Sequence, residues 1–240
     1  MAEDHSESVV TVLVAFAANA AIALAKTVAA VLTGSASMVA ESVHSWADAG
    51  NEVFLYVAGK RAAKPSDVRH PLGYGRDAYV WSMFAAVGLF TVGAAVSVQH
   101  GVSELGAHGP AEHPLINYAV LAISFVLEGV SFARAYGQVH RAAADAQSDV
   151  LDYAVNTSDP TVRAVVFEDA AALAGILIAA AGVALHQLTG SALYDALGSI
   201  AVGVLLGVTA VFLIQQNRKF LIGEAVDPDI RNAVLSMLLE

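Results

Sequence analysis

The chain has 240 residues, of which 57% are hydrophobic and only 14% are charged, and its mean hydropathy is +0.61. A soluble domain is roughly a quarter charged, so this composition excludes an ordinary soluble protein and indicates an integral membrane protein. The formal net charge of -10 argues against a nucleic-acid partner, and the absence of cysteine excludes disulfides and thiolate metal sites.

Six stretches are long and apolar enough to cross a bilayer as helices, which takes about 20 apolar residues each. In chain order they are 9–32, 38–59, 78–102, 115–136, 162–186 and 192–214. Ser35 is suited to cap the start of the second stretch, and Asp159 followed by Pro160 is suited to open the fifth. The sequence therefore predicts an all-α integral membrane protein with six transmembrane helices.

The lysine and arginine residues outside these stretches lie in only three places. They follow the second stretch, surround the connection between the fourth and fifth, and follow the sixth, whereas the other three connections contain none. By the positive-inside rule, this asymmetry places both termini in the cytoplasm. We expect a multi-pass protein of a bacterial inner or plasma membrane.

The predicted domain organisation has three parts. Residues 1–8 form a cytoplasmic N-terminal tail, and residues 9–222 form the six-helix transmembrane domain. After Asp227 and Pro228, apolar residues recur at helical spacing from Ile230 to Leu238, with nothing soluble to cover them. We interpret residues 223–240 as the start of a truncated cytoplasmic C-terminal domain. The alternative is a helix that lies on the membrane surface or on a partner.

Ionisable side chains inside the predicted spans indicate functional positions, because they are costly in a bilayer. The second span carries Glu41, His44, Asp48 and Glu52. His44 and Asp48 are four residues apart and share one helical face, so an imidazole and a carboxylate could bind one divalent cation together. The alternative is a hydrogen-bonded polar pair that holds helices together.

The fifth span carries Glu168 and Asp169 side by side. Adjacent residues point about 100° apart around a helix, so only one of these carboxylates can point fully at a given target. A site with His44, Asp48 and Asp169 has three ligands from two helices. Zn²⁺ commonly takes four ligands, and imidazole with carboxylates also suits Co²⁺, Fe²⁺ and Mn²⁺.

Three other intramembrane groups are open to two interpretations each. Lys26 either reaches outward or pairs with an acidic neighbour, and Glu128 either makes an interhelical hydrogen bond or relays protons. Asp195, near the outer end of the sixth span, is expected to line the bundle or to cap a helix.

Four segments resemble the cation diffusion facilitators, a family of zinc transporters. The segment from Ser35 to Asp48 (SASMVAESVHSWAD) resembles the second helix of that family, and His70 to Arg76 (HPLGYGR) resembles the loop that follows it. The segments FEDAAAL from Phe167 and YDALGS from Tyr194 resemble the fifth and sixth helices. The match spans nearly the whole chain in the right order, and the Phe-Glu-Asp sequence is most similar to the subgroup of zinc-transporter-nine relatives.

The resemblance implies a non-enzymatic antiporter that exports Zn²⁺ or a similar metal in exchange for protons, without a cofactor. It implies a homodimer in the bilayer and a transport site with two ligands four apart on the second helix and two on the fifth. His44, Asp48 and Asp169 fall on three of these positions, but the fourth falls on Val165, which cannot bind metal. Glu168 could replace it through a helix rotation, water could fill the position, or the metal could differ.

The same resemblance implies a second metal site in the loop after the second span. Asp67 and His70 match two of its ligands, but Tyr74 stands where a second histidine often lies. The alternative is a turn built around Pro71 and Gly73 that only orders the loop.

Two rival functions follow from these departures. A non-transporting scaffold or regulatory subunit of the same fold is favoured by Val165, which removes one expected ligand. An intramembrane metalloenzyme would need an activated water and a general base, and the sequence contains no His-Glu-x-x-His motif.

Overall fold

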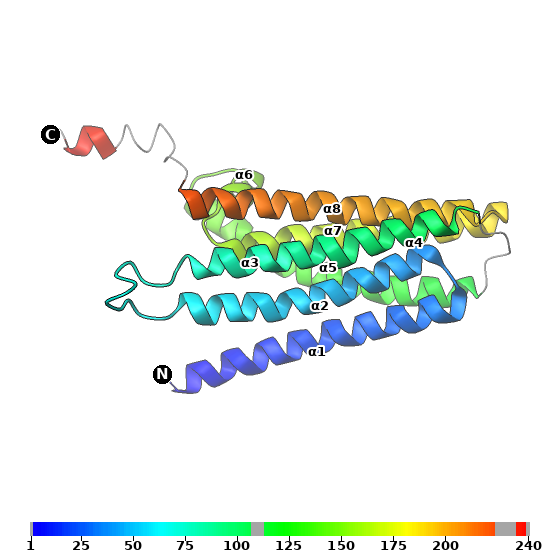
Figure 1. Cartoon of the computed structure of the whole chain (residues 1–240), viewed down its shortest axis with the longest axis horizontal. Helices are drawn as coiled ribbons and strands as arrows, with labels where there is room; N and C mark the ends of the chain where they lie inside the picture. Colours follow the sequence, from blue (N-terminus) through cyan, green and yellow to red (C-terminus); the bar gives the residue numbers. More distant parts are fainter. Residues whose placement is uncertain (1, 107–112, 224–233, 239–240) are drawn as a thin grey trace.

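The computed structural model describes residues 2–106, 113–223 and 234–238. This part of the chain is helical and contains no β-strand. Its elements are α1 (Ala2–Thr33), α2 (Ala36–Ala62), α3 (Asp77–Gly88), the π-helix η1 (Leu89–Ala95), α4 (Val96–Glu104), α5 (Pro114–Asp145), α6 (Val150–Asn156), α7 (Pro160–Thr189) and α8 (Leu193–Ile222). The long helices lie lengthwise in one bundle, and the start of α1 and the end of α8 lie at the same end of it (Figure 1).

Five stretches among the described residues are long and apolar enough to cross a membrane. They are Phe16–Thr33, Asp77–Glu104, Pro114–Asp145, Pro160–Thr189 and Leu193–Ile222. The second of them runs without a break through α3, η1 and α4. These stretches confirm an all-α, multi-pass membrane protein.

Helix α2 is the predicted span that is not among these five. Its 27 residues reach roughly 40 Å, enough for a bilayer, but acidic and basic side chains interrupt its apolar sequence. It lies within the bundle, where it contacts α1, α3, α7 and α8. A buried helix can carry polar groups that a lipid-facing one cannot, so α2 as a sixth span stays a prediction.

Both predicted helix starts are confirmed. The Ser35 hydroxyl accepts a hydrogen bond from the Met38 amide at 3.2 Å and caps α2. The Asp159 carboxylate accepts a bond from the Thr161 amide at 2.8 Å, and Pro160 occupies the first turn of α7. Such caps bond amides that have no partner inside the helix.

Several helices are longer than the predicted spans. Helix α5 continues to Asp145, beyond the predicted end at residue 136, and α1 begins at Ala2 within the predicted tail. Hydropathy marks only the apolar part of a helix, whereas backbone hydrogen bonding continues into water-facing sequence. The connection to α7 also contains a short helix, α6, which Asp149 caps and which hydropathy could not indicate.

The structure confirms that Asp195 caps a helix. Asp195 belongs to α8, but the helix that it caps is α2. Its carboxylate accepts hydrogen bonds from the Ala36 amide at 2.6 Å and from the Ser35 hydroxyl at 2.9 Å. Because these groups lie at the start of α2, a residue of α8 fixes the position of the polar helix.

Small residues let α8 approach the third span closely. A Cβ atom on Gly203 would lie 2.7 Å from the Val98 side chain and 2.9 Å from the Ala94 carbonyl oxygen. One helical turn away, the Ser199 hydroxyl donates a 2.9 Å hydrogen bond to the Ser97 carbonyl. This spacing of small residues is typical of tight contacts between membrane helices.

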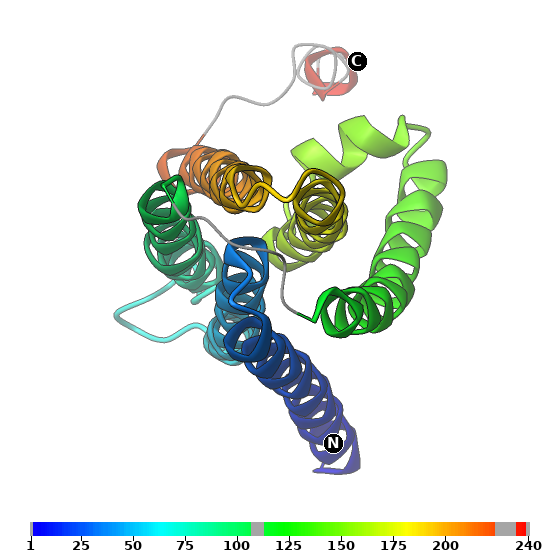
Figure 2. The same ribbon diagram turned by 90° about the vertical axis from the view of Figure 1, so that its right-hand side faces the viewer.

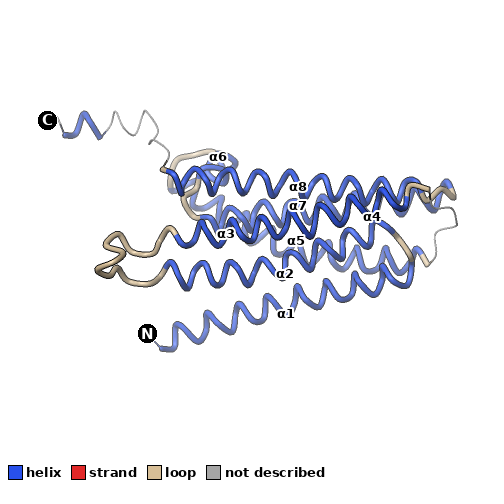
Figure 3. Tube along the Cα trace, viewed as in Figure 1, coloured by secondary structure: helices blue, strands red, loops and turns tan. Residues whose placement is uncertain are grey.

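Helix α1 diverges from the bundle toward its N-terminal end, as the end-on view in Figure 2 shows. It contacts α2 and, less extensively, α5. The loop over residues 63–76 and the helix α6 lie at this same end of the bundle (Figure 3). Of the C-terminal apolar stripe only residues 234–238 are described, as one helical turn with exposed side chains; residues 224–233 lie outside the described part.

Candidate functional site

One face of α2 carries a continuous row of polar side chains. Their spacing of three and four residues places them on the same side of the helix. Each has at least one buried nitrogen or oxygen atom without a hydrogen-bond partner in the described part of the chain: Glu41, His44, Ser45, Asp48, Asn51 and Glu52. Buried polar atoms are nearly always hydrogen-bonded in proteins, so this row is suited to contact ions or water.

His44 and Asp48 form the centre of this row. His44 Nε2 lies 3.3 Å from Asp48 Oδ2, and the side chains are 1% and 19% exposed. The other imidazole nitrogen, Nδ1, has no hydrogen-bond partner in the described part of the chain. Gly175 of α7 faces His44 closely: a Cβ atom there would lie 3.7 Å from Nδ1 and 2.6 Å from Glu41 Oε1.

Asp169 approaches this pair from α7. Its Oδ2 atom accepts a 2.8 Å hydrogen bond from the Ser131 hydroxyl of α5, and its carboxyl group interacts electrostatically with Asp48 and His44. The structure thus brings the three predicted ligands into one region. It does not close them around an ion, because no three acidic or histidine side chains among the described residues are arranged to hold a metal.

Glu168 points to a different partner. This buried side chain accepts a hydrogen bond from the Asn51 amide of α2 through Oε2, and its carboxyl group interacts electrostatically with Asp48 and Asp169. Glu168 is therefore near the predicted ligands, but one of its oxygens is already bound. Val165, one turn before Asp169, lines a cavity instead of reaching a metal ligand.

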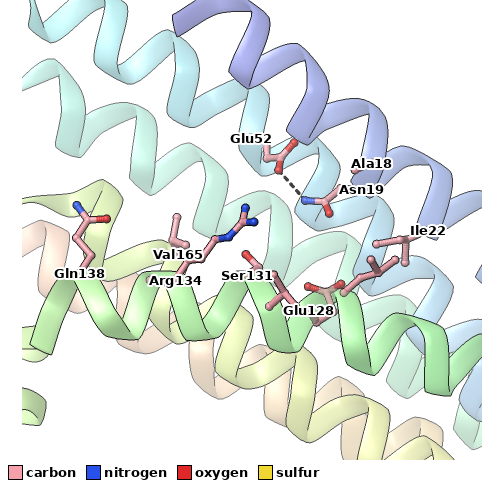
Figure 4. A pocket seen from close by; sticks show the side chains of 12 residues that line it. Ala18, Asn19, Ile22, Glu52, Glu128, Ser131, Arg134, Gln138 and Val165 are labelled. Atoms are coloured by element: carbon pink, nitrogen blue, oxygen red, sulfur yellow. Dashed lines mark hydrogen bonds between the residues drawn. The ribbon is translucent and has the colours of Figure 1, made fainter.

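That cavity has a volume of about 550 Å³ and lies between α1, α2, α5 and α7 (Figure 4). It occupies the half of the bundle nearer to the loop over residues 63–76, since its lining comes from the C-terminal half of α2 and the start of α7. The Asn19 amide donates a 2.6 Å hydrogen bond to Glu52 Oε1 across it. Further polar lining comes from α5, at Glu128, Ser131, Arg134 and Gln138.

Lys26 pairs with an acidic neighbour, Glu41, and does not reach outward from the bundle. Its ammonium nitrogen lies 2.9 Å from Glu41 Oε2, and the two side chains are 1% and 0% exposed. The pair joins α1 to α2 one turn from His44. A fully buried ion pair of this kind fixes the position of its helices, because separating the charges would leave each uncompensated.

The loop after α2 brings Asp67 and His70 together, with Asp67 Oδ1 3.2 Å from His70 Nδ1. The same carboxylate accepts hydrogen bonds from the His70 amide at 2.7 Å and from the Tyr74 hydroxyl at 2.7 Å. The Tyr74 bond, followed by that from the His70 backbone, lowers the pKa of Asp67 to about 2. Since the carboxylate is used inside the turn, this geometry favours a structural role for the loop over a metal site.

Comparison with known proteins decides the family. The family model described as the cation efflux transmembrane domain matches residues 12–222. The chain belongs to the cation efflux family. This match confirms the resemblance to zinc-transporting cation diffusion facilitators, a family of membrane transporters and not of enzymes.

Three relatives show how far the similarity extends. Metal tolerance protein C4 of Arabidopsis thaliana is 40% identical over 201 residues, which are 84% of this chain and 44% of the relative. The mitochondrial proton-coupled zinc antiporter SLC30A9 of Xenopus laevis is 38% identical over 218 residues, 91% of this chain and 39% of the relative. The human SLC30A9 protein is 36% identical over 218 residues, which are 91% of this chain and 38% of the human protein. The chain thus spans less than half the length of these relatives.

Sequence interpretation missed the residues that orient the predicted ligands. Ser131 binds Asp169 and Asn51 binds Glu168. A signal for Ser131 was present, because Ser124, Glu128 and Ser131 recur at helical spacing in the middle of α5, between apolar residues. Asn51 lies seven residues after His44 and continues the polar row of α2.

Proposed function

We propose that this chain is the transmembrane domain of an antiporter that exports Zn²⁺, or a similar divalent metal, from the cytoplasm in exchange for protons. The observation that carries the proposal is the pair His44 and Asp48, which contact each other, keep buried atoms without hydrogen-bond partners in the described part of the chain, and interact electrostatically with the carboxyl group of Asp169. Zn²⁺ readily takes imidazole nitrogen and carboxylate oxygen. The similarity to the SLC30A9 relatives, which are named proton-coupled zinc antiporters, supports the choice of substrates.

The proposed topology has six spans, with α2 as the sixth and both termini in the cytoplasm. The polar row of α2 faces helices instead of lipid, which supports its place inside the membrane. The basic residues of the 63–76 loop support the orientation. In this topology the cavity lies in the cytoplasmic half of the bundle.

Coupling to protons follows from the chemistry of the ligands. Metal binding requires a neutral imidazole and ionised carboxylates, so protons and metal compete for the same atoms. Metal entering from the cytoplasm would displace protons from His44, Asp48 and Asp169, and protons from the other side would release it. Rocking of the helices that carry these residues would expose the site to each side in turn.

The remaining assignments rest on the family resemblance. We propose that Mn²⁺, Fe²⁺ or Co²⁺ could replace Zn²⁺, that the loop residues Asp67 and His70 give at most a weak second site, and that the protein works as a homodimer in the bilayer. Residues 223–240 would lead into a cytoplasmic domain, in keeping with the greater length of the relatives.

The test uses the purified protein in sealed proteoliposomes loaded with a zinc-sensitive dye. We expect a pH gradient to drive Zn²⁺ uptake into vesicles with the wild-type protein, and Asp48→Asn to abolish it. Wild-type protein that binds Zn²⁺ but never moves it would favour the scaffold alternative. The inverse experiment, in which a Zn²⁺ gradient moves protons, separates antiport from a metal channel.

A further inference from the structure

Glu128 of α5 is a buried acidic side chain that the proposed site does not use. It is 7% exposed, it lines the cavity, and it makes no hydrogen bond or ion pair within the described part of the chain. Figure 4 shows its carboxylate on the α5 wall of the cavity, beside Ser131. An ionisable group in this position is costly unless it has a ligand to bind.

The surroundings of Glu128 are those of the proposed transport site. Its carboxyl group interacts electrostatically with Asp48, His44 and Asp169, and also with Lys26. Ser131, which hydrogen-bonds Asp169, lies three residues further along α5. Residues three apart on a helix lie on one face with Cβ atoms about 5–6 Å apart, so Glu128 and the bound Asp169 occupy adjacent positions.

The other nearby groups are less suited to complete a metal site. One oxygen of Glu168 is already bound to the side-chain amide of Asn51. Glu52 lines the opposite wall, where Asn19 binds one of its oxygens, although its carboxyl group also interacts electrostatically with Asp48 and Asp169. Val165 lines the cavity one turn before Asp169 but brings only methyl groups.

We propose that Glu128 is a direct ligand of the transported metal and fills the coordination position that Val165 cannot. Together with His44, Asp48 and Asp169 it gives one nitrogen and three carboxylate ligands, which meets the usual four-coordination of Zn²⁺. Three helices, α2, α5 and α7, then hold the ion. The inference rests on the proposed function, since it names a further ligand of the same site.

The experiment measures Co²⁺ binding to the purified full chain by calorimetry and visible absorption, since the Co²⁺ spectrum reports the ligands around the ion. Glu128→Gln keeps the shape of the side chain but removes its charge. We expect about tenfold weaker binding or more, a changed Co²⁺ spectrum and an unchanged melting temperature. Gln138→Leu is the control, because it changes a polar side chain of the same cavity that is not among the proposed ligands, and its Co²⁺ spectrum should match that of the wild type.

A second variant tests the position directly. Val165→Asp introduces a carboxylate on the face of Asp169, and combined with Glu128→Gln it should restore most of the lost Co²⁺ affinity. Glu128→Gln with a wild-type spectrum and affinity would overturn the inference, and so would weaker binding that accompanies a lower melting temperature and is not restored by Val165→Asp. If Asp48→Asn abolishes Co²⁺ binding while Glu128→Gln does not, only this inference fails. If neither wild type nor variants bind Co²⁺, the proposed function itself fails.

Discussion

The Ser131 hydroxyl on α5 donates a 2.8 Å hydrogen bond to Asp169 Oδ2 on α7, across 38 residues of sequence. This bond occupies one oxygen of a proposed metal ligand, and the carboxyl group also interacts electrostatically with Asp48 and His44. Groups that orient a metal ligand in this way commonly strengthen metal binding. A residue of α5 thus contacts a proposed ligand, whereas the sequence assigned the site to two helices alone.

Ser131→Ala removes this hydrogen bond without removing a ligand. We expect Zn²⁺ affinity to fall about tenfold, because the Asp169 carboxylate loses its fixed orientation, while the protein stays folded. Calorimetric titration with Zn²⁺ measures the change. Ser124→Ala, two turns earlier on the same helix and buried, is the control and should bind Zn²⁺ as tightly as the wild type. Equal affinities for all three proteins would contradict a role for Ser131.

His44→Asp should change both the metal preference and the pH dependence of transport. Imidazole favours Zn²⁺ over Mn²⁺, whereas carboxylate oxygen suits Mn²⁺. In water, histidine has a pKa of about 6.5 and aspartate a pKa of about 4. Because protons compete with the metal for these side chains, the variant should keep transporting at a more acidic cytoplasmic pH than the wild type. Uptake of both metals across a series of pH values tests this, and an unchanged Zn²⁺/Mn²⁺ ratio with an unchanged pH profile would place His44 outside the site.

The buried ion pair of Lys26 and Glu41 should contribute mainly to the stability of the fold. Lys26→Met leaves Glu41 buried without its partner, which typically costs about 3–5 kcal/mol. The double change Lys26→Met with Glu41→Leu removes both charges and should recover most of the lost stability. Thermal melting in detergent compares the three proteins. A single variant that melts at the wild-type temperature would show that the pair contributes little.

Tyr74→Phe should raise the pKa of Asp67 from about 2 toward its ordinary value, because the Tyr74 hydroxyl is the strongest of the bonds that lower it. A lowered pKa means that the carboxylate stabilises the loop at neutral pH and that this contribution is lost as the pH falls through about 2. The loop of the variant should therefore open at a higher pH. Carboxyl ¹³C NMR titration follows Asp67 directly, with Tyr118→Phe, at the other end of the bundle, as the control.

The fold was largely predictable, because hydropathy and helix caps depend on local sequence. Ser35 and Asp159 begin their helices where the cap residues indicated, and the apolar stretches became long helices. The polar character of α2 could be predicted, but its central place in the bundle could not. The roles of Ser131 and Asn51 depend on which helix faces lie together, and one sequence does not show that. The unmatched Val165 was visible in the sequence, whereas the buried Glu128 in the same cavity, without a hydrogen-bond partner among the described residues, required the structure.

Asp48→Ala and Asp169→Ala supply the controls for the central claim, since each removes a proposed ligand. We expect both proteins to fold, as judged by melting temperature, and to move no metal. Wild-type flux through well-folded Asp169→Ala protein would remove α7 from the site.

The most direct measurement records Zn²⁺ and protons together in sealed proteoliposomes. A Zn²⁺ gradient is imposed across vesicles that contain the wild-type protein and a pH-sensitive dye, in a buffer without other driving forces. The account predicts that Zn²⁺ entry is accompanied by proton movement in the opposite direction, and that both disappear in Asp48→Ala. Zn²⁺ entry without proton movement, or equal fluxes in Asp48→Ala and the wild type, would contradict it.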